Sequence, residues 1–345
     1  MAAPSLTLSN PGAINGDTGN WAKDNALFLK IFSGEVLTSF KRACIFEDLC
    51  QTRTIQNGRS AQFPVTGRFT AKYTTPGEML VGQGDMAQNE VVVRIDDYLV
   101  ADASLYSLDE AKNHYDIRSI YSTELGQALA REHDKRLART LAIGARTSTS
   151  DLTADLPAGL SPDDPYRTGT VVDINKATPT ADDLVASVFA AAEALDMKDV
   201  SKDGRVLVCT PESFYTLIQS SRAVNYDFNQ QGTNGSYSNG QIAKLAGFSI
   251  YSSNDIAQGN VTAKAGEQGY VSNGSVIKST VNMTNTKMLA FQKGAVGVVK
   301  LRDLGMGMTG NDYDVMYNAT LMTAKFALGV GCLRPECCVE VTNSQ

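Results

Sequence analysis

The sequence predicts an α+β fold, in which helices and strands follow one another without a regular β-α-β alternation. Three observations favour this class. Residues 116–146 have the period of a long helix, residues 58–104 have the alternation of strands, and the later chain mixes short strands with helices. With 345 residues, 43% of them hydrophobic, the chain is long enough to bury a substantial core, and we expect two lobes.

The predicted long helix covers residues 116–146 and contains no proline. Asp116 is a candidate N-cap, and charged residues fill the positions between the apolar ones. An uninterrupted helix of this length would extend about 45 Å, which suits a strut across a domain better than the wall of a pocket. The apolar positions recur every three to four residues and are Ile117, Ile120, Tyr121, Leu125, Ala128, Leu129, Leu137 and Leu141.

Residues 58–104 predict a long β-hairpin. Ala61–Val65 and Arg68–Tyr73 form the outgoing arm, and Glu90–Val100 returns with Val91, Val93 and Ile95 on one face. The connecting segment, residues 74–89, is rich in glycine and too long for a tight turn. Because a two-stranded hairpin alone is marginal in water, we expect something outside it to hold it, which is a first indication of assembly.

Further elements follow from local signals. A helix with a strongly apolar face is expected over residues 25–40, next to a polar N-terminal arm, and a short helix over Ser107–Tyr115. Helices are expected after the N-cap Thr180 and after Thr210, where Pro211 takes the first helical position. Strands are expected at residues 206–209, 245–251, 288–291, 295–302 and 339–341, and the apolar run 320–333 fits a strand or a buried helix.

Composition excludes several classes of function. The net charge of -6 argues against a dedicated nucleic-acid binder, and no apolar run is long enough to span a membrane. The N-terminus lacks the pattern of a signal peptide, so we expect the cysteines to stay reduced. They have no metal-ligand spacing with the two histidines, His114 and His133, and we expect buried thiols and no metal site. The six cysteines are Cys44, Cys50, Cys209, Cys332, Cys337 and Cys338.

No motif predicts catalysis or a cofactor. Residues 305–310, GMGMTG, match a dinucleotide-binding fingerprint, but Asp312 and Asp314 would repel a pyrophosphate, and a flexible glycine loop is the better interpretation. Adjacent carboxylates such as Asp96-Asp97 and Asp182-Asp183 are typical of turns and helix starts. A modest cluster of basic residues suits a solvated face or contact with packaged nucleic acid, and it comprises Lys30, Lys41, Arg42, Arg53, Arg59, Arg68 and Lys72.

Several segments are similar to one family. Ala26–Phe40, Ser60–Arg68, Thr75–Leu80, Asp109–Ala130, Ala295–Leu304 and Gly331–Glu336 resemble, in the same order, segments of the major capsid proteins of T7-like tailed bacteriophages. The resemblance covers nearly the whole chain, and the run Asn113-His114-Tyr115-Asp116 is specific. The chain departs from the family in residues 141–180 and 225–290, in the N-terminal tail and in the doubled Cys337-Cys338.

The resemblance implies the HK97-like phage capsid fold and a structural function without catalytic residues or cofactors. It implies an N-terminal arm (1–57), an E-loop (58–104), a P-domain (105–180) with a spine helix at about 116–146, an A-domain (181–304) and a return to the P-domain (305–345). It also implies self-assembly, in the host bacterial cytoplasm, into hexamers and pentamers of an icosahedral podovirus head of triangulation class T=7. The implied partners are a scaffolding protein, a portal protein and non-specifically packaged double-stranded DNA, with no membrane.

The residues and the resemblance together lead to a hypothesis about intersubunit contacts. The E-loop would lie over a neighbouring subunit, and the apolar face of the arm helix would be covered near the spine helix. Two alternatives stay open: an encapsulin-like nanocompartment of the same fold, and a soluble enzyme with an unrecognised site. The expected contact residues are Leu27, Phe28, Ile31, Phe32, Arg68, Thr75, Pro76, Gly77, Glu78, Met79, Gly82 and Gly84.

Overall fold

The computed structural model divides the chain into two compact units. Unit 1 comprises Met1–Cys44, Tyr98–His133 and Arg302–Ala327, and unit 2 comprises Ile45–Asp97, Asp134–Leu301 and Leu328–Gln345. Helices and strands occur in both, as the sequence predicts. The residues whose structure is described are 44–66, 73–79, 88–112, 117–148, 168–220, 235–236, 241–242, 244–256, 259–262, 264, 267, 271–272, 275–276, 280–309 and 315–343.

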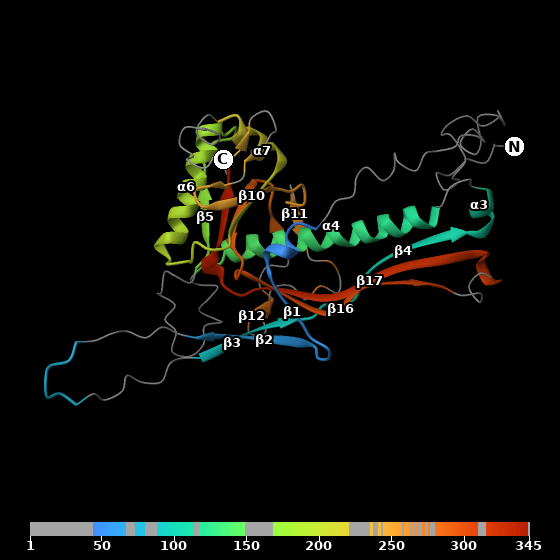
Figure 1. The fold of residues 1–345 in the computed structure, drawn as a ribbon, viewed down its shortest axis with the longest axis horizontal. Helices are drawn as coiled ribbons and strands as arrows, with labels where there is room; N and C mark the ends of the chain where they lie inside the picture. Colours follow the sequence, from blue (N-terminus) through green and yellow to red (C-terminus); the bar gives the residue numbers. More distant parts are fainter. Residues whose placement is uncertain are drawn as a thin grey trace. The chain divides into compact units, whose positions relative to one another are not determined.

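A six-stranded mixed sheet forms the core of unit 2, with the order β5-β18-β15-β6-β10-β9 (Figure 1). β15 is antiparallel to both β18 and β6, whereas β5 is parallel to β18 and β10 is parallel to β6. α6 (Ala181–Met197) packs against β5 and β18, and α7 (Pro211–Ile218) packs against β6. The strands are β5 (Thr170–Asp173), β6 (Arg205–Cys209), β9 (Lys244–Leu245), β10 (Phe248–Ser252), β15 (Thr286–Gln292) and β18 (Cys338–Thr342).

The two helices that pack against this sheet, α6 and α7, begin where the sequence predicts. Thr180 caps α6 by accepting a hydrogen bond from the Asp183 backbone N–H, and Asp183 accepts one in return from the Thr180 backbone N–H at 3.0 Å. These hydrogen bonds, together with one from Lys176, lower the pKa of Asp183 to about 2. Thr210 caps α7, and Pro211 takes the first turn, where no backbone donor is needed.

The remaining elements of unit 2 are a ribbon, a parallel pair and short hairpins. β2 (Ser60–Thr66) and β3 (Gln88–Arg94) form an antiparallel ribbon, and β1 (Gln51–Thr54) runs parallel to residues 297–300 of β16 (Val296–Met308). The short elements are η1 (Glu47–Leu49), β7 (Gly235–Ser236), β8 (Gln241–Ile242), β11 (Asn260–Thr262), β12 (Val271–Ser272), β13 (Ser275–Val276), β14 (Thr280–Asn282) and η3 (Pro335–Cys337).

In unit 1, a helix covers one face of a sheet. β4 (Leu99–Tyr106) pairs antiparallel with β17 (Ala319–Cys332) over eight residues, and α3 (Ser107–Lys112) follows β4. Leu125 and Leu129 of the long helix α4 (Ile117–Ala145) pack on Met322 and Ala324 of β17. The alternation of strand residues therefore buries one face under α4 and leaves the other exposed.

The second part of α4, which lies in unit 2, departs from the expected amphipathic pattern because three of its charged residues are buried, whereas Lys135 is exposed. Asp134, Arg136 and Arg139 are at most 8% exposed. Arg136 pairs with Asp96, Arg139 pairs with Glu267, and the Asp134 carboxylate accepts a hydrogen bond from the Ile45 backbone N–H at 2.8 Å. Burial lowers the pKa of Arg136 to about 10, so the guanidinium remains charged at neutral pH.

Arg146, directly after α4, binds the only charged residue of β18. Its guanidinium donates to both oxygens of Glu340, at 2.5 and 2.6 Å, and to the Asn282 carbonyl at 2.8 Å. The Glu340 side chain is 0% exposed and also accepts a hydrogen bond from the Thr286 hydroxyl. A buried carboxylate needs such partners, because an unpaired one costs several kcal/mol.

The predictions for residues 305–310 and 245–251 differ from the structure. The flexible glycine loop expected at residues 305–310 is wrong for its described part, since β16 continues to Met308 and the Thr309 N–H binds the Leu321 carbonyl at 3.0 Å. The single strand expected over residues 245–251 is a hairpin. Ala246 and Gly247, with φ of 50° and 83°, form the two-residue turn that matches the twist of the strands.

The predicted hairpin arms and connector also differ from the structure. The returning strand ends at Arg94 and does not reach Val100, because β4 pairs with β17 in a different sheet. The connector at residues 147–180 contains β5, which sequence reasoning missed. The run 320–333 is confirmed as a strand, and the strands predicted at 206–209, 288–291 and 339–341 are confirmed.

Most of the cysteines are buried free thiols, as the sequence predicts, whereas Cys44 is half-buried. Cys50, Cys209, Cys332, Cys337 and Cys338 are reduced and buried. Burial raises the pKa of Cys50 to about 12, so this thiol is protonated at neutral pH. Among the described helices, none carries an apolar stretch of the length that a bilayer crossing needs.

Replacing Gly329 with alanine should destabilise the fold, whereas the same change at Gly126 should stabilise it. A Cβ at Gly329 would lie 2.2 Å from the Arg94 carbonyl oxygen, which is backbone, so we expect a loss of about 1–3 kcal/mol. A Cβ at Gly126, within α4, would meet nothing within 4 Å, and alanine should add about 0.5–1 kcal/mol. Urea unfolding of unassembled subunits would measure both, and equal effects at the two positions would contradict the close approach at Gly329.

Replacing Glu340 with glutamine should lower the free energy of unfolding by about 1–3 kcal/mol, because Arg146, whose side chain is 28% exposed, would lose the charged partner that the fully buried Glu340 supplies. The matched control is Lys176→Ala. Its ion pair with Asp183 is solvent-exposed on the lysine side, at 54%, so removing it should cost clearly less than removing the Glu340 charge. Urea unfolding at pH 7 would compare the two variants, and a smaller loss for Glu340→Gln than for the control would count against the buried pair.

Candidate assembly interface

The tip of the predicted E-loop contains a well-defined turn. Pro76 and Gly77 are its central residues, Gly77 has a φ of 94°, and the Glu78 N–H donates to the Thr75 carbonyl at 3.1 Å. This is the arrangement of a type II turn, which favours proline followed by glycine. The Thr75 hydroxyl donates to the Glu78 carboxylate at 3.2 Å, which closes the turn a second time.

Every described side chain of this tip is exposed, including large apolar ones. Tyr73 is fully exposed and Met79 is 83% exposed, on either side of the turn. Exposed large apolar groups beside a conformationally fixed turn are typical of binding anchors, because little conformational entropy is lost when they are covered. The tip is therefore a candidate contact for another molecule.

The base of the same ribbon is held within unit 2. Ala61 and Phe63 of β2 and Val93 and Ile95 are buried in one cluster with Val299 of β16. The Ile95 N–H donates to the Arg59 carbonyl at 2.9 Å, and the Asp96 N–H donates to the Leu328 carbonyl at 3.1 Å. The base of the hairpin is therefore held from outside the hairpin, as expected, but by β16 and the β17 segment at Leu328 of the same chain, so this support does not itself indicate assembly.

A second exposed apolar group lies in unit 1 and was missed by sequence reasoning. The Ser107 N–H and hydroxyl both donate to the Asn318 carbonyl, at 3.0 and 3.1 Å, which joins the start of α3 to the segment that precedes β17. The tyrosine and leucine that flank Ser107 are exposed, as are three successive residues before Asn318. The side chains and their exposures are Tyr106 (52%), Leu108 (64%), Val315 (82%), Met316 (76%) and Tyr317 (60%).

The expected contact residues divide into two sets. Thr75, Pro76, Gly77, Glu78 and Met79 form the exposed turn described above. The others lie outside the described residues, and they are Leu27, Phe28, Ile31, Phe32, Arg68, Gly82 and Gly84.

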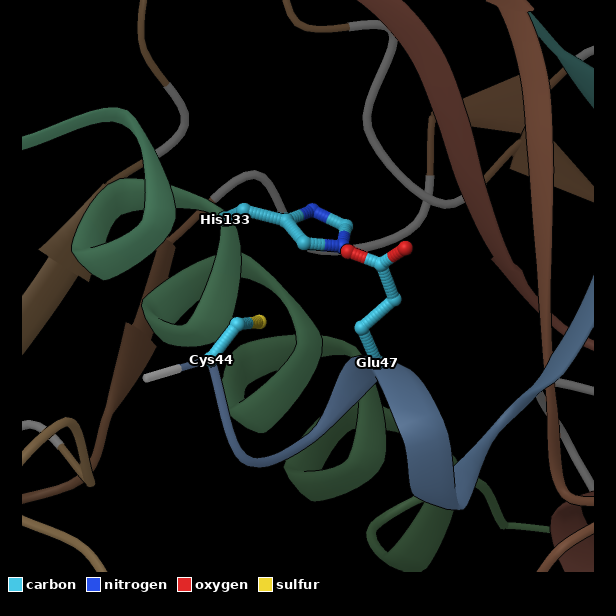
Figure 2. Close-up of side chains that lie close together, drawn as sticks. All are labelled: Cys44, Glu47 and His133. Carbon is cyan, nitrogen blue, oxygen red and sulfur yellow. The ribbon is translucent and has the colours of Figure 1, made fainter. Parts of the chain in front are cut away.

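Three side chains of the types that ligate metals are shown in Figure 2: Cys44, Glu47 and His133. Cys44 and His133 belong to unit 1, whereas Glu47 belongs to unit 2, so they do not form a site within either unit. Within unit 1, the His133 ring packs edge-on against Phe326, with 5.9 Å between the ring centroids. The described contact of His133 in unit 1 is therefore one of packing.

Comparison with known proteins identifies the family. A family model described as "Gp10A-like: Major capsid protein" matches residues 62–342. The chain is 34% identical over 326 residues to the major capsid protein of Escherichia phage T7, with 90% of each chain covered. It is 31% identical over 343 residues to the major capsid protein of Enterobacteria phage T3, with 93% of each chain covered.

Solved capsid structures agree with this assignment. The capsid protein in the structure of Cyanophage P-SCSP1u has a TM-score of 0.75 and 37% identity, with 99% of each chain covered. A chain of the mature capsid of bacteriophage PhiM1 has a TM-score of 0.69 at 19% identity, over 94% of this chain and 95% of that one, which shows the fold alone. These relatives are phage capsids, so the encapsulin-like alternative is not favoured. The chain therefore belongs to the Gp10A-like family of phage major capsid proteins and has the HK97-like fold.

Proposed function

We propose that this chain builds the icosahedral head of a podovirus by self-assembly into hexamers and pentamers of a T=7 shell. The head forms in the cytoplasm of a host bacterium around a scaffolding protein, receives a portal protein at one vertex and encloses double-stranded DNA. The chain has no catalytic role. Its membership of a structural capsid family supports this function.

The observation that carries the proposal is the contrast within the β2–β3 ribbon. Its base is buried in its own unit, whereas its tip exposes Tyr73 and Met79 beside a fixed turn. The base of the ribbon is packed within its own unit, whereas the apolar side chains at its tip are exposed to solvent, which is unfavourable. A second copy of the chain would bury these side chains in the assembled shell. In a closed shell each such contact can be weak, because symmetry repeats it many times.

The exposed apolar group of unit 1 is a second contact between copies in this proposal. Tyr106, Leu108 and residues 315–317 belong to two chain segments joined at Ser107 and Asn318. Aromatic residues and methionine are enriched where protein interfaces bury their core. The DNA would be held by confinement and by non-specific contact, because a chain with a net charge of -6 has no general affinity for phosphate.

Replacing Met79 with aspartate should leave the subunit folded but stop shells from closing. The side chain is 83% exposed, so the free energy of unfolding should change by no more than about 0.5 kcal/mol, whereas a buried charge at an intersubunit contact would weaken every copy of that contact. Met79→Leu, which keeps an apolar side chain, is the matched control. Each variant would be produced with its scaffolding protein and examined by sedimentation and electron microscopy.

The possible results distinguish the proposed contact at the tip from the proposed capsid function. Closed shells from the wild type and from Met79→Leu, with open or unassembled protein from Met79→Asp, would support the tip contact. Normal shells from Met79→Asp would remove the tip from the interface and leave the capsid function intact. Failure of the wild type to form any shell with its scaffolding protein would overturn the proposed function itself.

A further inference from the structure

Three buried cysteines gather where β17 ends and β18 begins. Cys332 is the last residue of β17, Cys338 is the first residue of β18, and Cys337 ends the short helix η3 between them. The Leu333 and Arg334 N–H groups both donate to the Ala295 carbonyl, at 2.9 and 3.2 Å, and the Cys337 N–H donates to the Arg334 carbonyl at 3.1 Å. These hydrogen bonds fold the connection back, so the two strand ends lie close together.

Two of the three sulfurs converge on one glycine. A Cβ at Gly144, in the last turn of α4, would lie 2.8 Å from the Cys332 Sγ and 3.0 Å from the Cys338 Sγ. The absence of a side chain at Gly144 is what leaves room for both sulfurs. The Cys338 thiol donates to the Arg334 carbonyl at 3.9 Å, and both Cys332 and Cys338 are 1% exposed. The Cys337 sulfur is not among the atoms that a Cβ at Gly144 would meet most closely.

We propose that Cys332 and Cys338 are a latent disulfide site, which hydrogen peroxide closes across Gly144. Both thiols are reduced in this structure, and all the atoms needed for the bond belong to unit 2. Peroxide is the appropriate class of oxidant because it is small, whereas the sulfurs lie beneath α4 and the strand ends and leave no room for a bulky disulfide reagent.

The chemistry balances with peroxide as the sole oxidant. The thiolate of one cysteine attacks a peroxide oxygen, and the O–O bond breaks. The cysteine becomes a sulfenic acid, and the departing hydroxide takes up the proton released by the thiol to become water. The second cysteine then attacks the sulfenic sulfur as its thiolate. The S–S bond forms, the S–O bond breaks, and the departing hydroxide takes the proton of the second thiol. In sum, two thiols and one peroxide give one disulfide and two waters.

The rate should be slow at neutral pH and should rise with pH. The neighbouring Cys332 side chain, followed by burial, holds the pKa of Cys338 well above its usual range. Only the thiolate reacts, and its fraction grows as the pH approaches the pKa. If the proposed function is right, the site would stay reduced in the host cytoplasm and could close only after the particle leaves it.

The closed bond would join two elements of unit 2 beside a third. It would tie the end of β17 to the start of β18, directly beside the last turn of α4 and two residues from Glu340, which Arg146 binds. A cross-link restricts mainly the unfolded chain, so the oxidised protein should unfold at higher denaturant concentration than the reduced protein. The bond is a property of the folded subunit and can form whether or not the subunit assembles.

Mapping of the oxidised protein tests the site directly. Reduced, folded protein would be treated with hydrogen peroxide at pH 8.5, and remaining thiols would be alkylated after denaturation. A protease that cuts after glutamate would cleave at Glu336 and so separate Cys332 from Cys337 and Cys338. Mass spectrometry without reduction should show these two fragments joined and two fewer alkylated thiols per chain.

Single substitutions identify the partner sulfur. Cys337→Ala should keep the link, whereas Cys332→Ala and Cys338→Ala should each abolish it. Wild-type protein oxidised in urea, where any pair can form, serves as the control for peroxide reactivity. The proposal is overturned if folded wild-type protein keeps all its thiols while the urea control loses them, if the cysteines go only to sulfinic or sulfonic acid, or if Cys337→Ala loses the link and Cys338→Ala retains it.

Discussion

The pairing of arginines in and directly after the second half of α4 with buried or nearly buried carboxylates is the constraint on which unit 2 depends. Arg136, Arg139 and Arg146 each find a carboxylate from a different part of the chain, namely Asp96, Glu267 and Glu340. A buried charge without its partner is strongly destabilising, so these segments cannot leave the helix independently. The helix therefore organises unit 2 through ion pairs as well as through apolar packing.

The ion pair between Arg136 and Asp96 also affects the β2–β3 ribbon. Asp96 follows the last paired residues of β3, so the same ion pair that satisfies Arg136 also fixes the root of the ribbon. Gly329 allows the Arg94 carbonyl to approach β17 closely at the same place. A fixed root provides a defined starting point for the exposed turn at the tip, which suits a contact with a neighbouring copy in the proposed function.

The sequence indicated which residues form the tip of the hairpin. It did not reveal the exposed apolar group of unit 1 or the burial of the ribbon base. The sequence indicated a long connector at the tip that contains Pro76 and Gly77, and the structure adds that these two residues form a turn within it. The exposed group at Tyr106, Leu108 and residues 315–317 was missed because exposed apolar residues beside strands look the same in sequence as buried ones. The support of the ribbon base was also missed, since Val299 and Leu328 are more than 200 residues away from it along the chain.

The sequence by itself determined the local elements of this protein: the proline-free α4, the capped starts of α6 and α7, the alternating β2–β3 ribbon and the turn at Gly77. These depend on periodicity, capping and backbone conformation, which act between residues close in the chain. Only the tertiary structure decided that Asp134, Arg136 and Arg139 are buried, that residues 305–308 continue a strand and that the Cys332 and Cys338 sulfurs meet at Gly144. Each of these depends on a partner far away in sequence, and a local pattern carries no information about which distant segment supplies it.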